Sequence, residues 1–144
     1  MNLDSNIEGS GQAALNVLHR YAWSFDSNDI DELSSVFAEE ATTRGIVAGK
    51  ESGWGPWKGR QQIVSRLGAI RKDQSDARRH QISTPVFLRL TDAEAIVKVY
   101  LSLFSTVGRG KPRLVTTGQY TATLETVSGH WKIIQLEAEL DGSF

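Results

Sequence analysis

Two side chains of this sequence have the chemistry of an acid–base pair, although they lie far apart along the chain. Asp26 ends a helical pattern and His80 opens a strand-like segment. A carboxylate that holds one ring nitrogen of a histidine fixes its tautomer and favours the imidazolium that forms when the other nitrogen takes a proton. Positioned proton transfer of this kind is worth roughly 100- to 10,000-fold in rate. The alternatives are that Asp26 is solvated or caps a turn, and that His80 is a structural residue.

A helix must present Asp26 beside an apolar stripe. We expect this helix over about residues 12–25, because four apolar residues recur at helical spacing: Leu15, Leu18, Ala22 and Phe25. The pattern then breaks, and Asp29 is placed to cap a second helix over about 29–37. A third amphipathic pattern predicts a helix over about 60–73.

His80 needs a strand, and the second half of the chain supplies four long ones. Together with an earlier short strand, we expect them at 41–47, 79–90, 95–107, 114–127 and 130–140. The turns between the long strands are short, and short turns join antiparallel neighbours. The parity of its strand places His80 on the same face as Ile82 and Thr84.

These elements predict an α+β fold. Three helices cannot cover both faces of a sheet of this size, so the economical arrangement is a strongly curved antiparallel sheet wrapped around the three N-terminal helices. Such a cone closes at one end on apolar side chains and leaves a pocket at the other. We expect one domain over residues 12–144, preceded by a polar, flexible tail over residues 1–11.

Residues 49–59 contain two tryptophans among four glycines and a proline, a composition that predicts a loop. Trp54 and Trp57 are costly to leave in water. They are expected either in a mobile lid that stacks on a flat, largely apolar substrate or at a subunit interface. The C-terminal Phe144 is a further candidate for covering the mouth of the pocket.

Charge and composition exclude several classes of protein. The 144 residues carry 16 Lys and Arg against 17 Asp and Glu, whereas a nucleic-acid binder needs a concentrated basic face. The basic runs 71–72 and 78–79 are interrupted by Asp73 and Asp76, which predicts a solvated loop. No apolar run is long enough to span a membrane.

Cysteine is absent, so a disulfide, a thiolate nucleophile or a cysteine-ligated metal is impossible. The three histidines, His19, His80 and His130, are scattered and lack the spacing of metal ligands, so we expect no metal site. His130 follows a glycine in a hairpin turn and is expected to be exposed. Residues 1–11 lack the apolar stretch of a signal peptide, and we expect a cytoplasmic protein.

Several short stretches of the chain resemble the SnoaL-like branch of the NTF2-like superfamily. In chain order they are Tyr21-Ala22-Trp23-Ser24-Phe25-Asp26, Asp29, Leu33, Val36-Phe37, Arg79-His80, Gly118-Gln119-Tyr120 and Gly129-His130-Trp131-Lys132-Ile133. Within the superfamily the chain is most similar to the scytalone dehydratase and hexachlorocyclohexane dehydrochlorinase group. The resemblance covers nearly the whole chain, and the family fold is the cone described above.

The resemblance also implies a chemistry. Enzymes of this group carry a buried aspartate on the first helix and a histidine at the start of the following long strand, and these positions match Asp26 and His80. It implies that His80 abstracts a proton from carbon, that Asp26 orients it, and that a leaving group departs from the neighbouring carbon without a cofactor.

The chain departs from scytalone dehydratase at three polar positions. Phe25 and Gly45 stand where that enzyme has tyrosines, and Thr121 stands where it has a second histidine, so scytalone itself is not the expected substrate. Tyr21 matches a place where related enzymes carry a functional polar residue. Its hydroxyl is expected to polarise a carbonyl or hold the leaving group; otherwise it is a half-buried aromatic with a wet tip. The residues expected to contact substrate are Trp54, Trp57, Phe25, Tyr100 and Thr121.

Two classes of function remain open. The first is a cofactor-independent lyase or isomerase, similar to a dehydratase, that acts on a small cyclic or polyketide-like molecule. The second is a non-catalytic module for ligand binding or assembly, such as the small subunit of ring-hydroxylating dioxygenases. The distance between Asp26 and His80 separates the two. Because relatives form dimers or trimers through the convex face of the sheet, a homodimer or homotrimer is expected.

Overall fold

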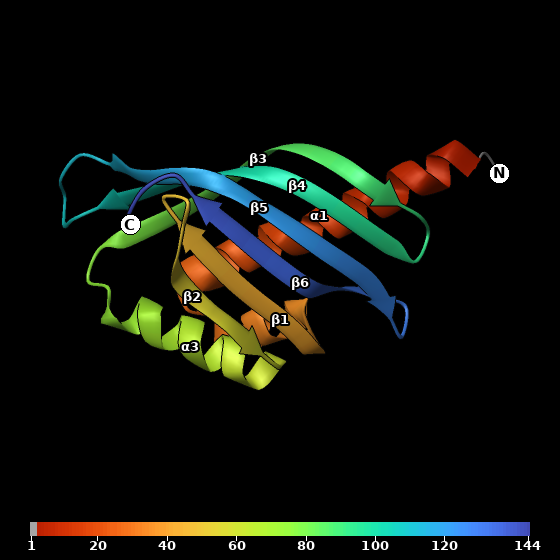
Figure 1. Ribbon diagram of the computed structural model, residues 1–144, viewed down its shortest axis with the longest axis horizontal. Helices are drawn as coiled ribbons and strands as arrows, with labels where there is room; N and C mark the ends of the chain where they lie inside the picture. The colour runs from red at the N-terminus through yellow and green to blue at the C-terminus, as the bar shows by residue number, and fades with distance from the viewer. Residues whose placement is uncertain (1–2) are drawn as a thin grey trace.

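A computed structural model describes residues 3–144 as three helices packed against one six-stranded sheet (Figure 1). The elements, in chain order, are α1 (Leu3–Ser27), α2 (Ile30–Val36), β1 (Phe37–Val47), β2 (Lys50–Lys58), α3 (Arg60–Asp73), β3 (Ala77–Leu90), β4 (Glu94–Thr106), β5 (Arg113–Val127) and β6 (His130–Leu140). No helix of this described part of the chain is long and apolar enough to cross a membrane.

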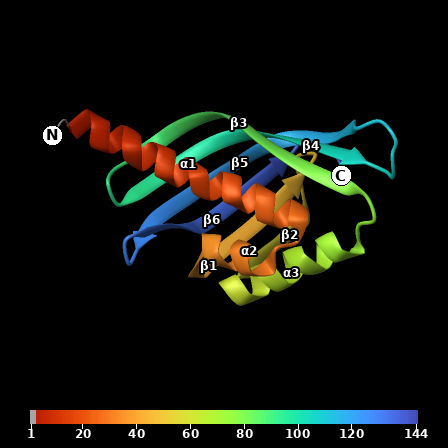
Figure 2. The same ribbon diagram turned by 180° about the vertical axis from the view of Figure 1, so that it is seen from behind.

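The sheet has the strand order β2-β1-β6-β5-β4-β3. Neighbours from β3 to β6 are consecutive and antiparallel, as the short turns predict. β1 is antiparallel to β2 but parallel to β6, a pairing that the sequence did not predict. The sheet curves, and α1 lies across one of its faces with α2 and α3 beside β1 (Figure 2). The predicted α+β cone is therefore confirmed.

Helix α1 begins at Leu3, well before the predicted start at residue 12. Its apolar stripe faces the sheet, and its members Ala14, Val17, Leu18, Tyr21, Ala22 and Phe25 are all buried. At Gly11 the helix passes close to β3. A Cβ added at this glycine would lie 3.3 Å from Leu90 Cδ2. Residues 3–11, which we predicted as a flexible tail, are helical in the structure, and residues 1–2 lie outside the described part.

The other two helices follow their sequence signals. Asp29 caps α2 as predicted, and its Oδ1 accepts a hydrogen bond from the Glu32 backbone N–H at 3.2 Å. This satisfies one of the free donors at the start of the helix. α3 has the predicted bounds and buries Ile63 and Leu67. Both short helices therefore turn an apolar face toward the core below α1.

The predicted loop over residues 49–59 is instead the strand β2, paired with β1. Its glycines allow the backbones to come close together. A Cβ at Gly53 would lie 1.9 Å from the carbonyl oxygen of Gly45, and one at Gly55 would lie 2.5 Å from that of Thr43. Composition cannot distinguish a loop from a strand in which glycines let a neighbouring backbone approach closely.

Candidate active site

The end of α1 and the start of β3 lie side by side, and this brings Asp26 to His80. Asp26 Oδ1 lies 2.5 Å from His80 Nδ1, and Asp26 Oδ2 accepts a hydrogen bond from the His80 backbone N–H at 2.9 Å. Both side chains are only 10% exposed. With Nδ1 donating to the carboxylate, Nε2 is the ring nitrogen left to accept a proton.

Neighbouring residues hold this pair in place. The Phe25 ring stacks on the His80 imidazole, with centroids 5.0 Å apart and planes at 25°. Arg71, in the last turn of α3, donates from Nε to the Asp26 backbone carbonyl at 2.9 Å and from Nη2 to that of Asp76 at 2.8 Å. These contacts tie together the end of α1, the end of α3 and the segment entering β3.

His80 lines a cavity of about 310 Å³ between α1, β2, the end of α3 and the inner face of the sheet. We call it the His80 cavity. Its lining residues are Tyr21, Phe25, Gly53, Trp54, Trp57, Leu67, Ile70, Gln74, Arg78, His80, Leu101, Leu103, Tyr120, Leu140 and Phe144. Aliphatic and aromatic walls with a few convergent polar groups are typical of a site for a small organic molecule.

Two tyrosines supply hydroxyl groups to this cavity. Tyr21 of α1 and Tyr120 of β5 are each 4% exposed, and their rings meet edge to face with centroids 6.0 Å apart. Burial raises the pKa of both phenols, and the nearby Asp26 carboxylate raises it further. Both therefore stay protonated at neutral pH, so each phenol is an O–H donor.

Trp54 and Trp57 line the cavity, and both are half-buried. The Trp54 indole lies over Gly45, where a Cβ would be 2.3 Å from the ring. Gly45 therefore leaves room for the Trp54 ring. Phe144 meets the Trp54 ring edge to face at 5.9 Å, so the C-terminal residue does reach the cavity.

Two residues predicted to contact substrate are on the other side of the sheet. Tyr100 is 58% exposed, and Thr121 alternates in burial with its buried neighbours Tyr120 and Ala122. Successive side chains of a strand point to opposite faces, so Leu101 and Tyr120 face the cavity instead. The predictions for Tyr100 and Thr121 are therefore wrong by one residue. The alternating apolar pattern along β5 could have identified Tyr120.

Arg78 is a second residue of the cavity that sequence reasoning missed. The charge pattern predicts a solvated loop there, but Arg78 lies in β3 two residues before His80, and its side chain is only 15% exposed. Its Nε donates to Asp76 Oδ2 at 2.6 Å, and Nη1 is buried without an acceptor among the described residues. A hydrogen bond from Ser105 and the Arg78 charge lower the pKa of Asp76. Residues two apart in a strand point to the same face, so the orientation predicted for His80 could have identified Arg78.

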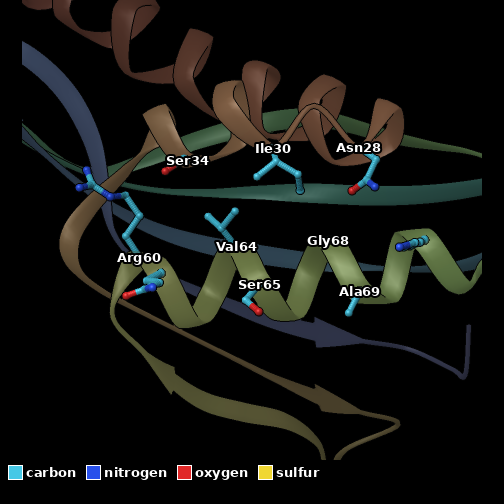
Figure 3. A pocket seen from close by; sticks show the side chains of 10 residues that line it. Asn28, Ile30, Ser34, Arg60, Val64, Ser65, Gly68 and Ala69 are labelled. Carbon is cyan, nitrogen blue, oxygen red and sulfur yellow. The ribbon is translucent and has the colours of Figure 1, made fainter.

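A second hollow, which we call the α2–α3 groove, has a larger volume of about 480 Å³ (Figure 3). It is lined by Asn28, Ile30, Ser34, Arg60, Gln61, Val64, Ser65, Gly68, Ala69 and Lys72. This set contains neither a carboxylate nor a histidine. His19 and His130 are both exposed. Within residues 3–144, no group of three or more histidine or acidic side chains is arranged to hold a metal ion.

Residues 11–137 match the SnoaL-like domain. The chain belongs to the SnoaL-like family. This match covers the elements from α1 to β6, including both Asp26 and His80. No curated protein matches the sequence.

Solved structures similar to this SnoaL-like protein share its fold. A protein of unknown function with a cystatin-like fold from Nostoc punctiforme is 20% identical, with a TM-score of 0.77 over 93% of this chain and 92% of that one. A candidate scytalone dehydratase from Novosphingobium aromaticivorans is also 20% identical, with a TM-score of 0.77 over 95% and 87%.

The beta subunit of a candidate aromatic-ring-hydroxylating dioxygenase from the same organism is 16% identical, with a TM-score of 0.77 over 92% and 90%. At such identities the likeness establishes the fold alone. The same scaffold therefore occurs in proteins named as an enzyme and as a subunit.

Proposed function

We propose that this SnoaL-like protein is a cofactor-independent lyase or isomerase acting on a small, largely apolar cyclic or polyketide-like substrate. The observation that carries the proposal is the 2.5 Å contact between Asp26 Oδ1 and His80 Nδ1 in the wall of the His80 cavity. A histidine held in this way has one ring nitrogen free, and because His80 lines the cavity this nitrogen could meet a substrate, which is the arrangement a general base requires.

The proposed reaction begins at His80 Nε2, which takes a proton from a substrate carbon. The electron pair of that C–H bond forms a carbon–carbon double bond, and the bond to a leaving group on the neighbouring carbon breaks. For a hydroxyl leaving group, the imidazolium returns its proton to the departing oxygen, so that water leaves and His80 is neutral again. The Asp26 carboxylate stabilises the imidazolium during this cycle.

The tyrosine pair supports the same step. Because burial keeps Tyr21 and Tyr120 protonated, a phenol O–H is available to donate to a carbonyl or to a departing oxygen. A donor of this kind has a larger effect in an apolar site than in water. The aromatic walls formed by Phe25, Trp54 and Trp57 suit a flat substrate and exclude water from the base.

A second candidate function is a non-catalytic module, and one observation favours it. Asp26 also holds the His80 backbone N–H, and that contact would fix the start of β3 without any chemistry. The similar dioxygenase beta subunit shows that the scaffold occurs in larger assemblies. Under this reading the His80 cavity stores or binds a ligand but does not transform it.

An exchange experiment distinguishes these two functions even while the natural substrate is unidentified. Tetralone, a flat cyclic ketone, is incubated with the protein in deuterated water, and the loss of its α-proton signal is followed by NMR. The proposal predicts exchange by the natural protein and a loss of roughly 100-fold or more in His80→Ala. Asp26→Asn should also exchange slowly. Equal exchange by all three proteins would exclude the pair as a catalytic unit.

We also propose that the protein assembles through the convex face of the sheet. Apolar side chains are exposed on β3 and β4, including Val86 at 47%, Leu88 at 58% and Tyr100 at 58%. Exposed apolar patches of this kind mark interaction surfaces. Light scattering should give the mass of a dimer or trimer, and Leu88→Lys should reduce it. A monomeric natural protein would contradict this proposal.

A further inference from the structure

The His80 cavity contains a charged group that the proton transfer proposed above does not use. We propose that Arg78 determines substrate specificity by binding a carboxylate, so that the substrate is a cyclic carboxylic acid rather than a neutral molecule. This inference rests on the proposal that the cavity binds a small substrate. It adds the chemical class of one substituent and the residue that recognises it.

The first support is that the position of Arg78 is constrained. It shares the inner face of β3 with His80, and its Nε is held by Asp76 at 2.6 Å. Asp76 in turn accepts a hydrogen bond from the Ser105 hydroxyl of β4. A lowered pKa keeps Asp76 ionised at neutral pH. The guanidinium is therefore oriented before any ligand arrives, which reduces the entropy lost on binding.

The second support is that most of the Arg78 donors are unused. A guanidinium has five N–H donors, and the structure records an acceptor only for the one on Nε. Nη1 is enclosed and has no partner within the described chain; Nη2 also has no recorded acceptor but is not enclosed, so it is the donor that a ligand reaches first. Buried donors without an acceptor are rare in native proteins. A carboxylate offers two oxygens in the geometry that matches the outer edge of the guanidinium.

The third support is the charge of the wall. Among the residues that line the cavity, Arg78 is the one that is charged at every physiological pH. Arg71, the nearest comparable side chain, already has acceptors for Nε, Nη1 and Nη2 in Asp26, Gln74 and Asp76. Although Asp76 pairs with its Nε, Arg78 keeps free donors in a mostly apolar wall, and charge-assisted hydrogen bonds from those donors favour a carboxylate over a neutral ligand.

The fourth support is the position of Arg78 relative to the base. Along β4, Arg78 lies opposite Ser105 and His80 lies opposite Leu103. Tyr120 lies opposite Val99 of β4. Along β4, His80 therefore lies between Arg78 and Tyr120. A carboxylate bound at Arg78 therefore leaves the carbon frame of the ligand to extend past His80 toward the tyrosine hydroxyls.

The test compares two probes of the same shape by calorimetry at neutral pH: naphthoate, which is an anion, and naphthamide, which is neutral. We expect the natural protein to bind naphthoate at least about tenfold more tightly, because a carboxylate forms charge-assisted hydrogen bonds with a guanidinium. Arg78→Met should abolish that preference and leave the affinity for naphthamide within about twofold.

Arg79→Met is the matched control, because Arg79 is adjacent and exposed and the variant loses the same charge. It should keep the preference for naphthoate. Equal binding of both probes by the natural protein, an undiminished preference in Arg78→Met, or an equal loss in both variants would overturn the proposal. Should Arg78→Met fail to fold, the Arg78 Nε–H signal of the natural protein decides: it should shift with naphthoate and not with naphthamide.

This test is independent of turnover. Asp26→Asn removes the proposed orientation of the base but leaves Arg78 and Asp76 in place, so it should keep the preference for naphthoate. A loss of exchange activity in Asp26→Asn and a loss of anion preference in Arg78→Met are therefore separate results. The failure of either proposal leaves the other open to its own test.

Discussion

The His80 cavity and the α2–α3 groove differ in what lines them. The α2–α3 groove is the larger, at about 480 Å³, and its charged residues are the cations Arg60 and Lys72. The His80 cavity has about 310 Å³, but a carboxylate-held imidazole, two phenols and a guanidinium meet there from different elements. Volume is therefore a poor guide to function, and the convergence of acid, base and donor groups is the better one.

The largest expected difference between the hollows is in reaction rate. His80→Ala should reduce tetralone exchange by roughly 100- to 10,000-fold, because it removes the proposed general base. Arg60→Ala, in the groove, should leave the rate within about twofold. NMR exchange measurements on the two purified variants test the comparison. Slow exchange by an Arg60→Ala variant of normal stability would contradict the assignment of the reaction to the His80 cavity.

The next largest effect is expected from a steric change in the wall of the His80 cavity. Gly45→Ala puts a Cβ at 2.3 Å from the Trp54 ring, so either the ring or the β1–β2 pair must move. We expect a loss of about 1–3 kcal/mol in the free energy of unfolding, as for other overpacked sites. Gly142→Ala is the control, because its nearest atom is 3.9 Å away. Urea unfolding measures both variants, and equal losses would contradict the close contact.

The tyrosine pair provides a pH-dependent comparison. In the folded state burial raises the pKa of Tyr21 and Tyr120, so above about pH 10 the unfolded chain loses these protons first. Fewer protons bound in the unfolded state mean that stability falls as pH rises. Tyr21→Phe should weaken this alkaline loss of stability and slow exchange by about tenfold. Unfolding followed by circular dichroism between neutral and alkaline pH checks the slope, and an unchanged slope would argue against a buried pair.

The smallest effect is expected at the acid end of the pH range. The pKa of Asp76 is lowered from 3.8 by Ser105 and Arg78, so the stability it contributes is present above that value and is lost as pH falls through the folded-state pKa. Asp76→Asn should therefore flatten the acid unfolding curve below about pH 4. An Asp73→Asn variant, at an exposed position, is the control and should keep the natural curve.

How much was predictable differs along the chain. The helix over 60–73 and the strand over 130–140 have the predicted bounds, because their periodicity reports directly which side is buried. α1 and β2 were mispredicted at polar or glycine-rich segments. There the deciding contacts are tertiary, such as Gly11 against β3 and Gly53 against β1. A polar or glycine-rich segment has a similar composition whether it packs against another element or forms a loop, so composition cannot distinguish the two cases.

For the candidate site, residue types and family resemblance were enough to single out Asp26, His80, Tyr21 and the two tryptophans. The sequence by itself determined most of the helices and strands, though not β2, and which side chains have useful chemistry, because both depend on local spacing. Only the tertiary structure decided that Tyr120 rather than Thr121 faces the cavity, that Trp54 lies over Gly45, and that Arg78 is buried beside the base. Those outcomes depend on strand parity and on packing between segments distant in sequence, where a shift of one residue reverses the face.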